Sequence, residues 1–336
     1  MAKIIKDGTI NLETAPTISS FASAVGKKEG EGPLAEYFDY ISEDVTLGEN
    51  SWEKSESKLQ QYAFTNALSK GGFSEKDMDF LFAGDLLNQC VASGYGARET
   101  SIPFFGLFGA CSTMAESLSL ASIFVDSGAA INTAAVTSSH FCSAERQFRF
   151  PVNYGGQRTP TAQWTATAAG CAIVSPHGKP PYVKSVTVGK IKDMGITDAN
   201  NMGAAMAEAA HNTISRHLTN TGQSVDDFDL ILTGDLGKVG SDMLKELFQR
   251  DNIDISEKHR DCGLMLYDLK KQDVHAGGSG CGCSASVLCG YILPEIAGGR
   301  LGNVLFAATG ALMSPTIVQQ GESIPGISHA VHISAV

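Results

Sequence analysis

The 336-residue sequence has no apolar run approaching the roughly 18 residues that a membrane-spanning helix needs. Its first 16 residues are polar and charged and do not have the pattern of a secretory signal. Charged residues make up only 18%, and basic residues are fewer than acidic ones, 25 against 36, for a net charge of −11. This balance argues against nucleic acid binding and against long-range attraction to an anionic membrane surface.

The sequence also lacks a metal-binding spacing. Cys281 and Cys283 have no second cysteine pair and no histidine at ligand spacing, so we expect no metal site, and we expect no cofactor. Eight cysteines without a signal peptide indicate free thiols in a reducing compartment. We therefore expect a protein that is made in the cytoplasm.

An internal duplication is the most informative feature that is present. The segment "DFLFAGDL" (residues 79–86) returns as "DLILTGDL" (residues 229–236), and the match aligns Asp85 with Asp235. Further matches align Cys111 with Cys283 and Thr137 with Thr309. A chance likeness between buried strands is the alternative.

We interpret the duplication as two halves, residues 1–178 and 179–336, divided near Pro180 in a Pro/Gly-rich stretch. Each half alternates strands and helices, which predicts an α/β fold with a mostly parallel sheet covered by helices. Two such βαβαβ-type halves are expected to pack as α/β/α/β/α layers. We expect Asp85 to superpose on Asp235 and Cys111 on Cys283.

Cys111 stands between a strand-like run and a helix-like run in "FGACSTMAES". A thiol at a helix start lies at the positive end of the helix dipole, which can lower its pKa below about 8.5 and favour nucleophilic chemistry. A nucleophile would also need a base or oxyanion donors. A buried structural cysteine is the alternative.

Three further segments are candidate binding regions. The glycine-rich "AGGSGCGCSAS" brings backbone N–H groups close to a ligand, with packing of a tight turn as the alternative; its candidate residues are Gly278, Ser279, Gly280 and Cys281. The loop at 138–157 carries His140, Arg146 and Arg149, with paired surface charges as the alternative. The polar segment 190–206 offers Asp193 and Asn201 as lining of a pocket, without the spacing of an EF-hand.

The duplication and the "GACS" motif together resemble the thiolase and ketoacyl synthase superfamily. That resemblance implies a thiolase-like fold in which Cys111 holds the position of the acyl-accepting nucleophile. The partner histidine of a "DLIVPHQAN"-like strand end falls on Gly234. The partner asparagine of a "GNTSAAS"-like turn, like the histidine of the thiolase "GHPxGAS" motif, falls on Cys281. The resemblance therefore implies a retained nucleophile without its catalytic partners.

A narrower resemblance runs in order from about residue 26 to 329. It is carried by "GKKEGEGPL", "AGDLLNQ", "LFGACST", "YGGQ", "GITDANNMGAAM", "LILTGDLG", "DCGLMLY" and "LMSPTIVQQGESIP". These motifs are similar to those of the stage V sporulation protein AD family. The resemblance implies a component of the machinery that loads dipicolinic acid into the developing spore. It implies binding of dipicolinate, free or as the calcium chelate, and a peripheral place at the spore inner membrane beside membrane proteins of the same operon.

We thus expect a binding protein whose ligand contacts come from Cys111 and the three candidate segments, with no catalytic residue. An active ketoacyl synthase or thiolase that uses Cys111 is the rival, and a scaffold with a vestigial pocket is a third interpretation. A homodimer is compatible with all three.

Overall fold

Strands made almost entirely of buried residues form the centre of the molecule. The computed structural model describes residues 2–148 and 157–336. Within them β3 (Thr17–Gly26), β7 (Thr133–Ser139), β9 (Ala168–Ser175), β14 (Asn303–Ala311) and β15 (Gly326–Ser334) bury nearly every side chain. Strands covered on both faces have this continuous apolar composition.

The strands are ordered β12-β11-β14-β15-β10-β3-β9-β7-β5-β6. Near one end, β11 (Leu230–Thr233) pairs in parallel with β12 (His259–Asp261) and β14, and near the other, β5 (Phe80–Gly84) pairs in parallel with β6 (Phe104–Leu107) and β7. The inner strands β15, β10 (Tyr182–Thr187), β3 and β9 pair antiparallel. Along this order, parallel pairing is limited to the outer strands, whereas the sequence predicted a mostly parallel sheet. The difference arises because β9 and β15 run back along β7 and β14.

The pattern of parallel and antiparallel pairs is therefore the same from either end of the strand order. At its centre, β3 pairs with β10 through Thr17 and Tyr182. Asp85 follows β5 and Asp235 follows β11, which hold matching places. The superposition of the two halves and their boundary stay predictions. The hairpin of β1 (Lys3–Lys6) and β2 (Thr9–Asn11), assigned by sequence to the first half, pairs with β10 of the second.

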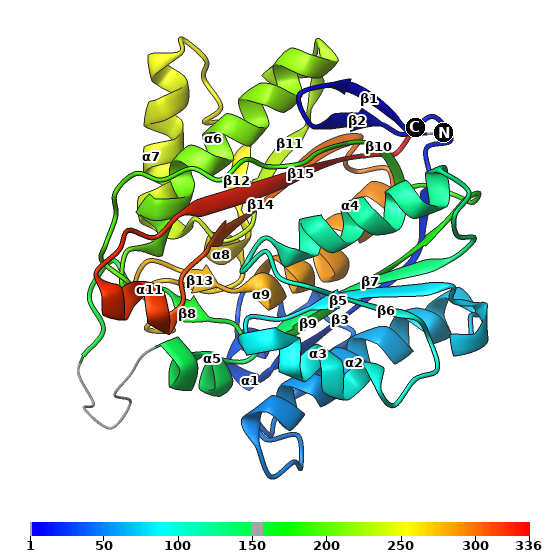
Figure 1. Cartoon of the computed structure of the whole chain (residues 1–336), viewed down its shortest axis with the longest axis horizontal. Coiled ribbons are helices and arrows are strands. Elements are labelled where there is room, and N and C mark those ends of the chain that lie inside the picture. Colours follow the sequence, from blue (N-terminus) through cyan, green and yellow to red (C-terminus); the bar gives the residue numbers. More distant parts are fainter. Residues whose placement is uncertain (1, 149–156) are drawn as a thin grey trace.

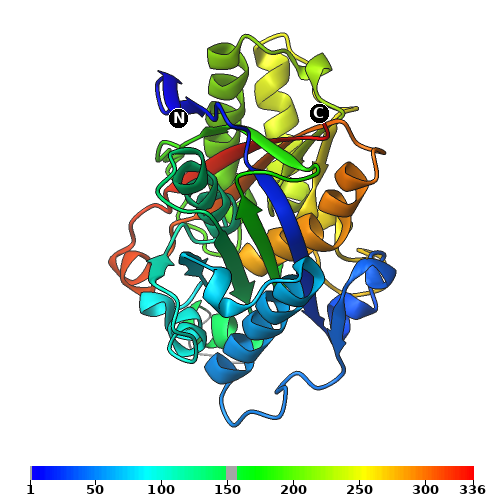
Figure 2. The ribbon, with the colours of Figure 1, turned by 90° about the vertical axis from the view of Figure 1, so that its right-hand side faces the viewer.

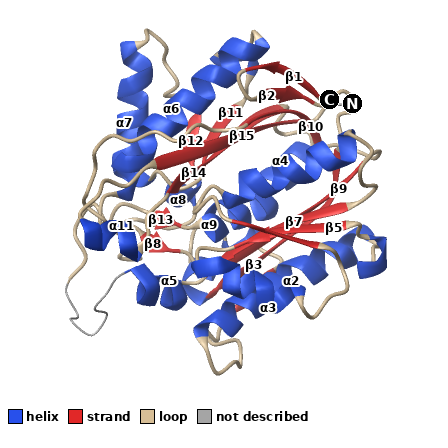
Figure 3. Ribbon diagram, viewed as in Figure 1, coloured by secondary structure: helices blue, strands red, loops and turns tan. Residues whose placement is uncertain are grey.

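Helices separate and cover the two halves of the strand order, giving the expected layers (Figures 1 and 3). α2 (Trp52–Gly71) and α3 (Val91–Ala97) cover one outer face, and α6 (Met202–Thr221) and α7 (Gly237–Arg250) cover the other. Figure 2 shows α6 and α7 side by side at the end of the molecule opposite α2. The layered α/β architecture predicted from the sequence is thus the observed one.

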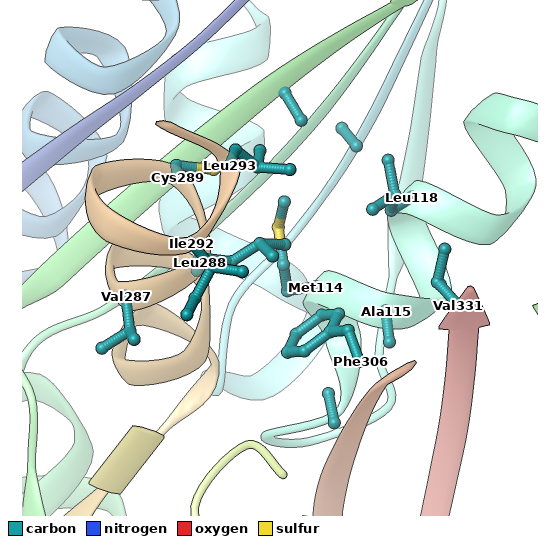
Figure 4. Packing of buried hydrophobic residues seen from close by; sticks show 14 of the residues in the cluster. Met114, Ala115, Leu118, Val287, Leu288, Cys289, Ile292, Leu293, Phe306 and Val331 are labelled. Atoms are coloured by element: carbon teal, nitrogen blue, oxygen red, sulfur yellow. The ribbon is translucent and has the colours of Figure 1, made fainter. Parts of the chain in front are cut away.

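The middle layer consists of α4 (Thr113–Asp126) and α9 (Cys281–Val287), which continues through a π-helical turn, Leu288–Ile292, into α10 (Leu293–Ala297). Figure 4 shows Met114, Ala115 and Leu118 of α4 packed near Leu288 and Ile292, with Phe306 of β14 and Val331 of β15 beside them. This core fixes the starts of α4 and α9 next to each other.

The remaining elements are short. They are β4 (Tyr40–Ser42), β8 (Trp164–Thr165), β13 (Gly278–Ser279), α1 (Lys27–Gly30), α5 (Phe141–Phe148), α8 (Cys262–Met265), α11 (Pro315–Gln320) and short 3-10 turns at Ala35–Tyr37, Glu75–Asp77, Asn88–Cys90 and Val225–Asp227.

Candidate ligand-binding site

Cys111 lies at a sharp turn between β6 and α4. The preceding residue, Ala110, has a φ of 51°, a left-handed conformation that costs a non-glycine residue about 1–2 kcal/mol. The turn is closed by the N–H of Ser112, which donates to the carbonyl of Gly109 at 3.1 Å. Cys111 is 5% exposed, and it packs with Leu86, Ala144 and Cys281. The strained turn thus presents the thiol at the start of α4, where the sequence placed it.

A buried carboxylate, Asp235, organises the surroundings of this thiol. One of its oxygens accepts the N–H of Gly280 at 2.8 Å and the hydroxyl of Ser279 at 3.1 Å. The other accepts the hydroxyl of Thr309 at 2.9 Å. The Ser279 hydroxyl lies 3.8 Å from the Cys111 sulfur. Asp235 therefore joins the start of α4 to the turn before α9.

The electrostatics of this arrangement hold Cys111 as a thiol. Burial is the main cause that raises the pKa of Cys111 well above its ordinary value, and the negative charge of Asp235 raises it further. The pKa of Asp235 is itself raised, because burial outweighs its hydrogen bonds. A helix dipole favours the thiolate, but here burial and a neighbouring carboxylate oppose it more strongly. The sequence predicted that the helix dipole could lower the pKa of Cys111, but in the structure this pKa is raised.

The expected catalytic partners of a nucleophile are not in place. A side chain at Gly234 would meet the backbone of Ala308 and Thr309 in β14 within about 3.2 Å, so this position faces a strand. Cys281 is buried and donates its thiol to the carbonyl of Ser138 at 3.0 Å. No histidine lines the pocket above Cys111 in the part of the chain that the structure describes. Activation by a histidine base is therefore missing there.

A cavity of about 260 Å³ opens above Cys111. Its walls are largely apolar, and polar groups come from Arg158, Glu145, Gln163, Thr165, Asn200 and Ser279. The apolar lining consists of Leu86, Phe108, Ala110, Ala144, Phe148, Ala162, Ala199, Met202, Ala311, Met313 and Val318. An apolar cleft with a few polar groups is typical of a small-molecule site.

The structure brings only part of the predicted site to this cavity. Cys111 and Ser279 line it. Gly278, Gly280 and Cys281 lie behind them: Gly278 accepts a hydrogen bond from Gln163 at 2.7 Å, and the N–H of Gly280 is taken by Asp235. The glycine turn therefore forms the floor of the cavity. The Gly280 N–H, which the sequence predicted to contact a ligand, instead donates to Asp235.

His140 does not line the cavity. Its Nδ1 accepts the N–H of Cys142 at 3.2 Å, so its Nε2 is the atom that donates to the carbonyl of Val45 at 2.8 Å. Burial lowers the pKa of His140, which keeps the ring neutral. The sequence prediction gave His140 a positive charge for binding a ligand, and the structure corrects this. The neutral ring has a structural role, because it anchors the start of α5.

The other predicted charges also lie away from the cavity. Arg146 is exposed and forms an ion pair with Glu53, beside a separate surface hollow. Asp193 is exposed and accepts the hydroxyl of Ser323 at 2.6 Å, and this contact lowers its pKa. Asn201 precedes α6 between two lining residues, Asn200 and Met202, but is not itself in the lining. Arg149 lies outside the described residues.

Sequence reasoning missed Arg158 and Gln163, which lie in a polar stretch just after the loop it singled out. Arg158 packs its guanidinium 4.6 Å from the ring centroid of Trp164 and donates to the carbonyl of Asp273 at 2.7 Å. Gln163 donates to the carbonyls of Asp235 and Gly278, each at 2.7 Å. The parallel pairing of β8 with β13 brings Gln163 to the cavity, and no local sequence pattern indicates that pairing.

The described residues also bear on the class of site. They contain no group of three or more His, Cys, Asp or Glu side chains placed to hold a metal ion. No helix among them is both long enough and apolar enough to traverse a bilayer.

The sequence matches the family model described as Stage V sporulation protein AD over residues 6–334. The chain belongs to the stage V sporulation protein AD family. It is 46% identical over 314 residues to the "Stage V sporulation protein AD" of Bacillus subtilis (strain 168), an alignment that covers 94% of this chain and 93% of that protein. The family resemblance seen in the sequence is therefore confirmed, and the chain is a sporulation protein with a thiolase-like fold.

Solved structures show the same fold at much lower identity. The 3-oxoacyl-[acyl-carrier-protein] synthase III of Aquifex aeolicus VF5 is 14% identical with a TM-score of 0.57, covering 95% of this chain and 99% of its own. A cerulenin-bound OleA of Xanthomonas campestris is 13% identical with a TM-score of 0.60, covering 95% and 97%. These likenesses concern the fold alone.

Proposed function

We propose that this protein binds dipicolinic acid, free or as its calcium chelate, in the cavity above Cys111. We place it in the machinery that loads dipicolinate into the developing spore, peripheral to the inner membrane and beside membrane proteins of the same operon. The observation that carries the proposal is an apolar cavity with a cationic side chain in its lining and a protonated thiol on its floor. Membership of the sporulation family supports the biological setting.

The chemistry of the lining suits a flat aromatic ring with carboxylates at its edge. Phe108, Phe148 and Met313 offer apolar and polarisable surface to the faces of a ring. Arg158 is held by stacking on Trp164 and by Asp273, so little side-chain entropy is lost when a carboxylate binds to it. The net charge of −11 repels a free dianion at long range, so recognition depends on these local contacts.

The rival function, acyl transfer from Cys111, needs a thiolate and a base. Asp235 stabilises the protonated thiol, and the positions implied for the partners are Gly234 and Cys281. A carboxylate is a much weaker base than the thiolate of a buried cysteine whose pKa is raised, so Asp235 is a poor acceptor for the Cys111 proton. Binding is therefore better supported than catalysis.

Calorimetric titration with dipicolinate, with and without equimolar calcium, tests the proposal. We expect Arg158→Gln to weaken binding about tenfold or more, since each charge-assisted hydrogen bond contributes roughly 1.5–3 kcal/mol. Arg146→Gln is the matched control, because it removes the same charge outside the cavity and should leave the affinity unchanged. Pyridine-2-carboxylate, which has one carboxylate, should bind markedly less tightly. Absence of dipicolinate binding to the parent, or equal losses in the two arginine variants, would overturn the proposal.

A further inference from the structure

The side chain of Gln163 lies in the cavity lining with one half of its amide satisfied and the other not. Its Nε2 donates to the carbonyls of Asp235 and Gly278, both at 2.7 Å. Its Oε1 is buried and has no hydrogen-bond partner among the described residues, although the residue is only 6% exposed. A buried acceptor of this kind is costly unless something outside the protein chain satisfies it.

The orientation of this amide is fixed by its neighbours. Two carbonyl oxygens at hydrogen-bond distance can be satisfied only by the NH2 end, so the oxygen must be on the other side. Gly237 permits the close approach: its φ is +60°, and a side chain there would come within 2.9 Å of the Gln163 Nε2. Residues of the second half, Asp235, Gly237 and Gly278, therefore fix the position of the Gln163 Oε1.

The chemistry of this acceptor distinguishes the two forms of the ligand. Free dipicolinate at neutral pH presents two carboxylates and a ring nitrogen, all of which are acceptors and would oppose the Gln163 oxygen. In the calcium chelate those atoms hold the cation, and Ca²⁺ takes about six to eight ligands, among which amide carbonyl oxygens are common. The chelate thus brings a cation with open coordination positions, which an amide oxygen can fill.

We infer that Gln163 selects the calcium chelate of dipicolinate over the free dianion by offering its Oε1 to the calcium ion. This inference rests on the proposed function. The described residues provide no metal site of their own, so the ion would arrive with its chelator. Glu145 in the same lining adds a negative charge that favours the neutral chelate over the dianion. Gln163 is therefore a specificity-determining residue.

The test compares affinities for dipicolinate with excess EGTA, for dipicolinate with equimolar calcium, and for calcium chloride alone. We expect the parent to bind the chelate at least about tenfold more tightly than the free dianion, and calcium alone not measurably. Gln163→Met keeps the length of the side chain but removes the amide, and should bring the ratio close to one while the affinity for the free dianion changes little. Gln272→Met is the matched control: that amide is satisfied at both ends, by Asp268 and Lys28, and lies outside the cavity lining.

The outcomes separate this inference from the proposed function. If the parent binds neither form, the proposed function fails. If the parent binds dipicolinate without preferring the chelate, or if Gln163→Met keeps the parent's ratio, only the role of Gln163 is overturned. Should Gln163→Met fail to fold, as judged by circular dichroism, the parent's ratio alone decides, and equal affinities refute the inference.

Discussion

The carboxylate of Asp235 reaches the thiol of Cys111 through one hydroxyl, that of Ser279, which donates to Asp235 at 3.1 Å and lies 3.8 Å from the Cys111 sulfur. Asp85, which follows the matching strand β5, instead accepts the N–H of Leu87 and the N–H and hydroxyl of Ser93. The two aspartates thus have different tasks: Asp85 closes a local loop, and Asp235 holds the floor of the cavity. This difference accounts for a cysteine that is kept in position but not activated.

Asp235→Asn should make Cys111 more reactive. The substitution removes the negative charge that, after burial, contributes most to the raised pKa of Cys111, so the pKa should fall. We expect the alkylation rate of Cys111 by iodoacetamide at pH 8.5 to rise about tenfold. Peptide mass spectrometry resolves Cys111 from Cys142, which is partly exposed and should be labelled in both proteins. A parent Cys111 that is alkylated as readily as a free thiol at pH 8.5 would contradict this prediction.

The parent protein should not turn over acyl-CoA. Without a base, the help that general base catalysis gives, typically about 10²–10⁴-fold in rate, is missing. Incubation with acetyl-CoA or malonyl-CoA, followed by intact mass measurement, should show no stoichiometric acylation and no continued release of CoA. Rapid acylation that Cys111→Ala abolishes, accompanied by turnover, would support the enzymatic rival.

Local sequence patterns were sufficient for the fold and for the position of Cys111. The "GD" strand ends and the "GACS" turn are short-range features, and the structure places both where the motifs predict. The duplicated motifs also led to the layered α/β architecture. These features were predictable because each depends on residues that are neighbours in the chain.

The rest of the site depends on contacts between distant segments. Gln163 reaches the floor because β8 pairs in parallel with β13, with Trp164 opposite Gly278. His140 is buried where its Nε2 donates to the carbonyl of Val45, a residue 95 positions away, and this burial lowers its pKa despite the hydrogen bond. Neither relationship leaves a pattern in one sequence, so a histidine in a polar loop was assigned a charge that its burial removes.

Stability should fall in mild acid partly because of His217. This ring is buried, and burial together with His332 lowers its pKa to about 3. In the unfolded chain the histidine takes up a proton near pH 6.5, whereas in the folded chain it stays neutral down to about pH 3. The unfolded state therefore binds more protons below pH 6.5, and the free energy of unfolding decreases as the pH falls.

Urea unfolding of the parent and of His217→Phe between pH 7 and pH 4 checks this. The variant loses the contact to Thr187 and should be less stable at pH 7. Below pH 6.5 its free energy of unfolding should fall less steeply than that of the parent. The two slopes should differ by about 1.4 kcal/mol per pH unit, because the variant lacks the one proton that His217 takes up on unfolding. The comparison of the two slopes matters, because Asp261, whose pKa burial raises to about 7, acts in the opposite direction in both proteins. Equal slopes would contradict the prediction.

The protein should form a homodimer through β6. This strand ends the strand order next to β5, so its outer backbone groups have no strand partner in the described chain. Phe104 and Phe105 are 38% and 42% exposed, and Phe108, just beyond the strand, is 46% exposed and lines the cavity. An apolar edge strand without lysine or proline readily pairs with another strand, and two copies of β6 related by a twofold axis can pair antiparallel.

Phe104→Lys tests the interface, because a lysine on an edge strand is disfavoured against a second copy of itself. Light scattering coupled to size-exclusion chromatography at micromolar concentration should give twice the chain mass for the parent and a shift toward the monomer for the variant, with the dimer dissociation constant raised about tenfold or more. Ile131→Lys, at a position 66% exposed and outside β6, is the control and should remain dimeric. A monomeric parent would refute the prediction, and a Phe104→Lys variant as dimeric as the parent would place the interface elsewhere. If the dimer forms as predicted, Phe108 lies close to the partner chain, and dipicolinate affinity should then increase with protein concentration across the dimer dissociation constant.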